Sequence, residues 1–473
     1  MITGTITYKN IEFTFVFDQN ELRLIPPKEK RDFIHFNWLM KEIKPGIYAN
    51  GDPLEMEEKY LIGRCNEDGK RIIFFTNYGA GIDSFNTVLI VDIAAYILCR
   101  FDRDVIDRIS FESPELNYIY PANMVLMYSL GGLENDSTIG VTASNKTLRA
   151  IDKEEFIVAG KSVEVSFNIT RTLSASMDKA PITVSTSMDF DFEPTDDYDF
   201  IFQLWIIARR LVQYLCFRQN LGFTKTRLST PYKGNKHEAF AEMVAVPEHI
   251  TQEQKSLKKG RYIKHEYLEG SIGKLLQSIA DNNLYLRHIP KTFESSHTID
   301  ESSFVLITAA FEWEFRRLFP EGVKKKTART NAERTATQKL GDLIKESRGE
   351  LKNIYKFLSK LIESDSLAKK ILYTGKELDS VITIFGERLY QMNGEKLKYA
   401  EMGERIAAQR NDFAHGNLDK DFNGLAFLDL VYLKWIIYAM QLKCHGVSDI
   451  NIQSAINDLF GQGINLPYQQ NTE

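Results

Sequence analysis

Apolar and polar residues alternate with a period of two through much of the first half of the chain. Every second residue is apolar in Ile11–Phe17 (IEFTFVF) and again in Val163–Ile169 (VEVSFNI). This alternation is typical of strands with one buried and one exposed face, which commonly pair antiparallel. Three shorter apolar runs add further predicted strands: Arg71–Phe75, Thr87–Val91 and Ile182–Thr186.

Beyond about residue 265 the apolar spacing becomes that of helices. A helical stretch at Gly270–Leu286 is followed by a connector at His288–Asp300. Further helices are predicted at Glu301–Phe319, Thr335–Leu361 with a break, Gly375–Asn393, Tyr399–His415 and Leu425–Lys443. The pattern therefore predicts an α+β multidomain protein. A β-rich N-terminal region (1–265) and a helix with connector (266–300) precede an all-α bundle (301–461) and a C-terminal tail (462–473).

An acidic run, Asp189–Asp199, holds six carboxylates in eleven residues. Clustered carboxylates can bind a metal or serve in acid–base catalysis. This run, however, leads directly into a predicted apolar helix at Phe200–Phe217. Acidic side chains before a helix cap its N-terminal N–H groups and complement the helix dipole. We therefore interpret the run as a helix start.

Composition narrows the classes of protein that the chain can belong to. The 473 residues are 43% hydrophobic and 26% charged, as in globular proteins, and the net charge is −5. Any nucleic-acid contact must therefore come from a local basic patch. The four cysteines have no CxxC spacing and the histidines no metal-ligand spacing, so we expect no metal, no cofactor and a reducing, cytoplasmic setting.

The N-terminus and one apolar segment indicate whether the chain has a signal peptide or a membrane span. The first residues, MITGTITYKN, lack the charged start and apolar core of a signal peptide. Asp429 and Lys434 divide Leu425–Leu442 into apolar runs much shorter than the roughly 20 residues that a membrane span requires. We expect a buried bundle helix and no membrane segment.

The stretch Ala407–Asn417, AAQRNDFAHGN, holds the candidate chemistry of the chain. On a straight helix Asn411 and His415 share a face, whereas Arg410 lies about 140° around from His415. A helix start, a helix distortion, the reach of the arginine, or a second subunit would bring the two together. The glycine after His415 is typical of a helix C-cap, where the dipole favours a protonated histidine.

These residue types suit cleavage of a phosphodiester without a metal. A histidine can take a proton from a ribose 2′-hydroxyl or protonate a leaving oxygen, and arginine matches phosphate oxygens. RNA is the expected substrate because it carries the internal 2′-hydroxyl. The alternative is a helix-end His415 with no chemistry, and an Arg410 that merely pairs with Glu404 or Asp412.

The segment RNDFAH resembles the R-N-x-x-x-H signature of the HEPN superfamily, helical-bundle proteins many of which are metal-independent ribonucleases. As in that family, the motif falls between two bundle helices. The β-rich N-terminal region and the chain length also look like the ApeA-type HEPN proteins of bacterial anti-phage defence. The resemblance covers the architecture of the whole chain, but its specific residues are confined to RNDFAHG.

The resemblance implies roles for particular residues. Arg410 and His415 would be catalytic and Asn411 the polar residue of the motif. An acidic residue on an early bundle helix often supports the site, and Glu312 is the best candidate, with Glu314 as the alternative. HEPN nucleases commonly act as homodimers with two facing motifs. Some HEPN toxins carry a tyrosine two residues after the histidine, whereas Asn417 stands here, which counts against control by a nucleotidyltransferase antitoxin.

The segment 316–339 has eight basic and two acidic residues. We predict a basic loop in which Lys324, Lys325, Lys326 and Arg329 contact the RNA backbone, and a merely solvated loop is the alternative.

We thus expect a cytoplasmic HEPN endoribonuclease of abortive infection that cuts RNA, such as tRNA, to leave a 2′,3′-cyclic phosphate. The N-terminal region would sense infection, through a phage-derived trigger, or restrain the nuclease. Two rival hypotheses are a non-catalytic HEPN module that binds nucleotide, RNA or protein, and a HEPN toxin with a separate antitoxin.

Overall fold

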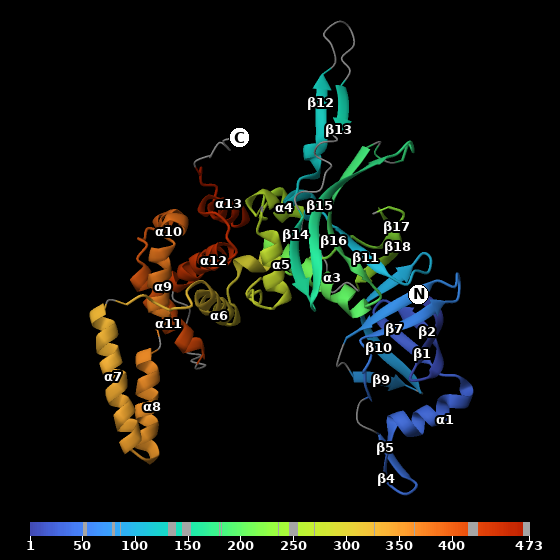
Figure 1. Cartoon of the computed structure of the whole chain (residues 1–473), viewed down its shortest axis with the longest axis horizontal. Coiled ribbons are helices and arrows are strands. Elements are labelled where there is room, and N and C mark those ends of the chain that lie inside the picture. Colours follow the sequence, from blue (N-terminus) through green and yellow to red (C-terminus); the bar gives the residue numbers. More distant parts are fainter. Residues whose placement is uncertain are drawn as a thin grey trace. The chain divides into compact units, whose positions relative to one another are not determined.

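The computed structural model describes residues 1–50, 54–77, 81–85, 87–130, 139–143, 153–178, 180, 182–234, 236–245, 254–268, 270–325, 327–363, 365–414 and 424–466. The chain forms two compact units (Figure 1). The first, here the β unit, comprises Met1–Gln213, Asn220–Gln252 and Ile272–Ala280. The second, the helical unit, comprises Tyr214–Gln219, Glu253–Ser271 and Asp281–Glu473. The predicted α+β multidomain class, with β-rich followed by helical sequence, is confirmed.

A closed antiparallel barrel occupies the start of the β unit. Its strands, in spatial order, are β10 (Val88–Cys99), β3 (Glu21–Ile25), β2 (Ile11–Asp18), β1 (Ile2–Tyr8), β7 (Tyr60–Cys65) and β8 (Arg71–Thr76). The barrel closes because β8 also pairs with β10. In β2 the alternate side chains Phe13 and Phe15 are fully buried, as the period of two predicted.

A second sheet continues from the far half of β10. Its strands are β18 (Lys236–Ala245), β17 (Lys225–Tyr232), β11 (Ile106–Glu112), β16 (Ile182–Thr195), β15 (Lys161–Leu173) and β14 (Glu154–Val158). Helix α5 (Ile272–Ala280) packs on β14, and the Gly273 N–H donates to Glu154 Oε2 at 2.8 Å. A β-carbon at Gly273 would lie 2.6 Å from the Glu155 carbonyl oxygen, so glycine permits this close packing.

The remaining elements of the β unit are short except for α3 (Tyr198–Cys216), whose last turn belongs to the helical unit. They are α1 (Arg31–Ile34), a π-helical turn (His35–Leu39), β4 (Met40–Lys44), β5 (Ile47–Asn50), β6 (Leu54–Glu55), β9 (Gly81–Phe85), α2 (Leu116–Ile119), β12 (Leu126–Leu130), β13 (Ile139–Ala143) and 3₁₀ turns at Lys28–Lys30 and Ala122–Val125.

The acidic run divides between a strand and a helix cap. Asp189 and Asp191 lie in β16, where Asp191 Oδ2 accepts from Arg108 Nη2 at 2.8 Å. Only Asp197 caps α3, accepting from the Phe200 N–H at 3.0 Å. The interpretation of the whole run as a helix start is therefore wrong for its first half. Its phenylalanines alternate with the acids, which is a strand pattern.

The helical unit is built from α4 (Gln254–Lys258), α6 (Glu301–Leu318), α7 (Thr327–Glu346), α8 (Gly349–Glu363), α9 (Leu367–Glu377), α10 (Asp379–Met392), α11 (Tyr399–Ala414), α12 (Gly424–Cys444) and α13 (Asp449–Leu459). Two 3₁₀ turns, His265–Tyr267 and Glu294–His297, also belong to it. The predicted break between Thr335 and Leu361 separates α7 from α8. The predicted helix Gly375–Asn393 covers the end of α9 and the whole of α10, which are divided at Leu378. Helix α13 was not predicted.

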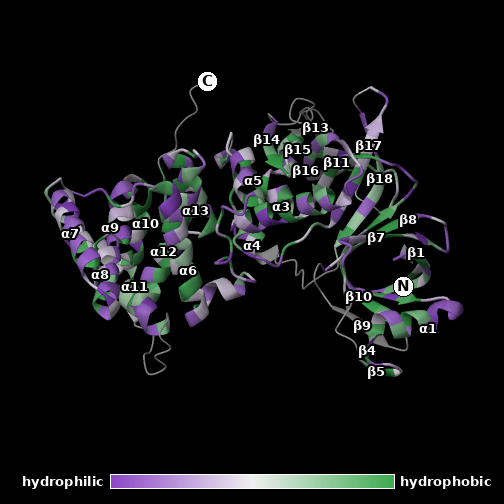
Figure 2. Ribbon diagram, turned by 60° about the horizontal axis from the view of Figure 1, so that its bottom comes forward, coloured by the Kyte–Doolittle hydropathy of each residue, from purple (hydrophilic) through white to green (hydrophobic). Residues whose placement is uncertain are grey.

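Helix α12 forms the core of the helical unit. It contacts α6, α10, α11 and α13, and apolar residues run along it (Figure 2). Among the described residues it is the one helix long and apolar enough to cross a membrane, but 83% of its most apolar window is buried. The prediction of a buried bundle helix agrees with this burial. Helix α7, in contrast, is largely hydrophilic (Figure 2).

Candidate active site

A buried ionic cluster fixes helix α11, which carries the motif. Arg405 donates through Nε and Nη2 to the two carboxylate oxygens of Asp429, each at 2.8 Å, and Tyr390 donates its hydroxyl to the same carboxylate. Asp429 is fully buried in α12. The hydrogen bond with Asp429 raises the pKa of Arg405, and burial raises the pKa of Tyr390. The cluster therefore holds α11 against α10 and α12 one turn before the motif.

Close packing also holds α11 against α9 and α6. A β-carbon at Gly403 would lie 2.8 Å from the Ala368 carbonyl oxygen of α9. In the last turn of α11, the ring of Phe413 meets that of Phe304 on α6 edge to face, with centroids 5.4 Å apart. Arg410 therefore lies on a helix anchored to its neighbours on both sides of this residue.

Arg410 faces a carboxylate from another helix. Its Nη2 lies 3.6 Å from Oε2 of Glu312 on α6, and its side chain is 42% exposed. The other oxygen of Glu312 accepts from Lys370 Nζ of α9 at 3.3 Å. Three helices thus place two cations around one carboxylate, where part of the guanidinium remains accessible. Arginine in this position can contact a phosphate while the carboxylate sets its orientation.

The structure brings Arg410 and Glu312 together and separates them from Glu314. Glu314 is buried and serves the packing of the unit, accepting from the Tyr285 N–H at 3.0 Å, Gln441 Nε2 at 3.1 Å and Arg317 Nη1 at 2.8 Å. Of the two acidic candidates, Glu312 is the one beside the motif. Lys370 was not foreseen, because nothing in the sequence marks this lysine of α9 apart from its neighbours.

Of the other two residues of the motif, the structure describes Asn411 alone. Asn411 is exposed, and as the next residue of the helix it lies about 100° around the axis from Arg410. His415 lies outside the described residues, as do Gly416 and Asn417. The place of the histidine, its C-cap and its distance from Arg410 therefore stay predictions.

The basic segment is largely helical rather than a loop, since α7 begins at Thr327. Lys325 Nζ lies 2.8 Å from Glu333 and 3.5 Å from Asp365, and Arg329 Nε lies 2.7 Å from the same glutamate. The hydrogen bond with Glu333 raises the pKa of Lys325. Lys324 is exposed, and Lys326 lies outside the described residues. Two of the predicted RNA contacts are thus engaged with carboxylates.

Among the described residues, no group of three or more histidine, cysteine, aspartate or glutamate side chains could hold a metal ion. Comparison of the chain with models of protein families, with curated proteins and with solved structures finds no match. The candidate site therefore rests on its own residues: an accessible guanidinium, the carboxylate that orients it, and a second cation.

Proposed function

We propose that the helical unit is a metal-independent endoribonuclease of the HEPN type. The observation that carries the proposal is the pairing of Arg410 with Glu312 across α11 and α6 at 3.6 Å, beside the motif RNDFAH. The family resemblance implies an acidic residue that supports the site, with Glu312 as the best candidate and Glu314 as the alternative, and the contact of Glu312 with Arg410 supports the choice of Glu312. Lys370, on the same carboxylate, adds positive charge near the expected phosphate.

In the proposed reaction, His415 removes the proton of a ribose 2′-hydroxyl, and that oxygen attacks the adjacent phosphorus. The bond from phosphorus to the 5′-oxygen of the next nucleotide breaks, and this leaving oxygen takes up a proton. The products are a 2′,3′-cyclic phosphate and a free 5′-hydroxyl. Arg410 stabilises the charge on the non-bridging oxygens, and Glu312 positions the guanidinium.

In this proposal two copies of the chain pair through their helical units, so that two motifs face one another. The β unit restrains the nuclease until a phage-derived trigger is present, in keeping with a cytoplasmic role in abortive infection. A nuclease that acts on the RNA of its own host, such as tRNA, must be held inactive in a healthy cell. A large unit with no recognisable catalytic motif suits that task.

Expression in bacteria tests the proposal in the cell. In bacteria that express the wild-type chain, infection by a phage that triggers the protein is expected to arrest growth and to fragment host RNA. Arg410→Ala and His415→Ala should prevent both effects while accumulating to the same level. Growth arrest that persists in both variants would instead support a non-catalytic binding role, and a small protein that co-purifies would support a toxin with a separate antitoxin.

A further inference from the structure

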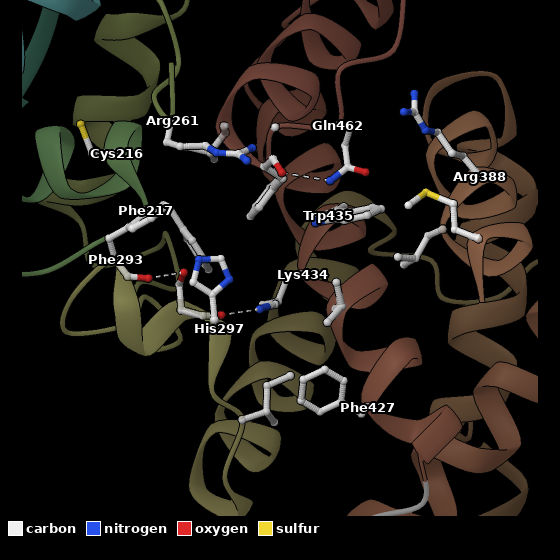
Figure 3. Close-up of a pocket in the computed structure, with 18 residues that line it drawn as sticks. Cys216, Phe217, Arg261, Phe293, His297, Arg388, Phe427, Lys434, Trp435 and Gln462 are labelled. Atoms are coloured by element: carbon white, nitrogen blue, oxygen red, sulfur yellow. Dashed lines mark hydrogen bonds between the residues drawn. The ribbon is translucent and has the colours of Figure 1, made fainter. Parts of the chain in front are cut away.

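A pocket of about 500 Å³ opens in the helical unit. All of its lining residues belong to this unit, and neither Arg410 nor Glu312 is among them. Figure 3 shows Arg261 entering from the segment that follows α4 and Lys434 from α12, with Trp435 beside them. His297 and Arg388 complete its basic groups.

The charge of this pocket is uncompensated. Two arginines, a lysine and a histidine line it, and no aspartate or glutamate is among the described residues that form its wall. Lys434 is only 7% exposed and donates to the Ser296 carbonyl oxygen at 3.3 Å. A buried cation is costly unless a negative group accompanies it. Burial accordingly lowers the pKa of Lys434 to about 8.

Arg261 also carries a donor that the protein does not satisfy. Its Nη1 atom is buried and has no hydrogen-bond acceptor within the described part of the chain. A β-carbon at Gly461 would lie 1.1 Å from this nitrogen, and Gly461 has a φ of +56°. Glycine thus makes the space that the guanidinium occupies. Because Nη1 is fully buried, an anion in the pocket would reach Arg261 through its other guanidinium nitrogens.

Aromatic rings form the apolar part of the wall. Trp435 is 3% exposed and Phe217 8% exposed, and the Lys434 Nζ atom lies 5.8 Å from the centroid of the Phe217 ring. Phe427, which also lines the pocket, is 39% exposed, so its ring offers a flat surface on which an aromatic ligand can stack. The wall therefore combines several cations, which suit a group with more than one negative charge, with a surface for a flat body.

We propose that this pocket binds a small aromatic phosphate monoester, with the phosphate held by Arg261 and Lys434 and the aromatic body against Phe427. The site is independent of the proposed nuclease chemistry, since the two share no residue. An experiment that rules out ligand binding would therefore leave the proposal of RNA cleavage untouched, and the reverse also holds.

Isothermal titration and thermal unfolding of the full chain test this site with phenyl phosphate, adenosine 5′-monophosphate, inorganic phosphate and benzyl alcohol. We expect phenyl phosphate to bind and to raise Tm. Inorganic phosphate should bind at least about tenfold more weakly because it has no ring to stack, and the uncharged alcohol should not bind. Binding of the nucleotide would show that the pocket also admits the larger monoester. No binding of either ester at millimolar concentration overturns the proposal.

Two variants, Lys434→Met and Arg261→Gln, test whether the ligand binds in this pocket. Each removes one charged donor, and a charge-assisted hydrogen bond contributes about 1.5–3 kcal/mol, so each variant should bind phenyl phosphate at least about tenfold more weakly. Lys396→Met, at an exposed lysine that does not line the pocket, is the matched control and should bind as wild type does. Circular dichroism and the Tm without ligand show whether each variant is folded. Unchanged affinity in both folded pocket variants overturns the assignment.

Discussion

At the scale of single residues, the proposed reaction depends most on the ion pair between Arg410 and Glu312. The pair joins α11 to α6, and its arginine stays 42% exposed. A surface ion pair contributes little stability on its own, so an accessible pair at this place has more consequence for the orientation of the guanidinium. Glu312 is thus a positioning residue in the proposed reaction.

Glu312→Gln tests that role. The variant keeps the size of the side chain but loses the charge that orients Arg410, so RNA cleavage should slow by about tenfold, with stability changed by less than about 1 kcal/mol. Measurement of single-turnover cleavage rates gives the comparison. Glu404→Gln, at an exposed glutamate on α11, is the control and should cut at the wild-type rate. Equal rates for all three proteins would remove Glu312 from the site.

The buried His265 should make the free energy of unfolding depend on pH. It is 3% exposed, and burial lowers its pKa to about 4 from the ordinary 6.5. Above pH 6.5 both folded and unfolded chains hold it neutral, so its contribution is fully present there. As the pH falls from 6.5 towards 4, His265 becomes protonated in the unfolded chain but stays neutral in the folded chain. The free energy of unfolding should then fall by up to about 1.4 kcal/mol per pH unit.

Urea unfolding at pH 7 and pH 5 measures this loss. His265→Leu cannot be protonated and should lose distinctly less stability between the two pH values than the wild type. His237→Leu, at a histidine of the β unit, gives the comparison at a site outside the helical unit. The interpretation fails if wild type and His265→Leu lose the same free energy over this range.

At the scale of elements, α11 and α12 are joined by a buried charge that anchors the motif. Asp429 is fully buried and binds Arg405 through both oxygens, whereas Asp449 of α13 forms an exposed pair with Lys443. Removal of one partner from a buried pair costs about 3–5 kcal/mol, and loss of an exposed pair costs less than about 1 kcal/mol. The two aspartates should therefore differ sharply.

Asp429→Asn should lower the free energy of unfolding by about 3 kcal/mol, because a neutral amide leaves Arg405 without its counter-charge. Asp449→Asn should lower it by less than about 1 kcal/mol. Urea titration of both variants makes the comparison. Similar small losses in the two proteins would show that the buried cluster does not anchor α11.

Helix α7 carries part of the basic segment that was expected to be a loop: Arg329 lies on α7, whereas Lys324 and Lys325 lie just before it. Lys325 and Arg329 share Glu333, while Lys324 and Arg334 are exposed. If the start of α7 and the residues just before it contact the RNA backbone, Lys324→Gln with Arg334→Gln should reduce the slope of log K against log salt by about 1.4, at about 0.7 per phosphate contact on single strands.

Fluorescence titration with a single-stranded RNA at several salt concentrations measures the slope. Lys325→Gln serves as the control, because this lysine already binds two carboxylates and should leave the slope nearly unchanged. An unchanged slope in the double variant would exclude Lys324 and Arg334 from the RNA-binding surface.

Much of the element pattern was predictable because periodicity reports burial directly. The strand at Ile11–Phe17 and the helix at Glu301–Phe319 were predicted to within a residue or two of β2 and α6. The division at Leu378 was not, since neither glycine nor proline marks it. Helix α13 was missed although Ser448 caps it, accepting from the Asn451 N–H at 3.4 Å. Short helices carry too few apolar repeats for spacing alone to reveal them.

The candidate site was predictable only in part. The motif marks Arg410 by local sequence, but Glu312 and Glu314 stand two residues apart on one helix, and their environments depend on which neighbours α6 meets. Lys370 and the pocket around Lys434 depend on contacts between residues far apart in the chain. No local pattern encodes such contacts, so the pocket could not be foreseen from the sequence.

At the scale of the whole molecule, a β unit with a barrel and a branching sheet is joined to a helical unit that carries the motif. The proposed account gives the chemistry to the helical unit and the restraint to the β unit. It depends on one claim above all, that the motif RNDFAH cuts RNA without a metal.

That claim is tested most directly by incubating purified full-length protein with RNA in the presence of EDTA and mapping the new ends. The account predicts that wild type leaves 2′,3′-cyclic phosphates, and that Arg410→Ala and His415→Ala each slow cleavage by at least about a hundredfold. If His415→Ala cuts as fast as wild type, or if EDTA abolishes all cleavage, the central claim is contradicted.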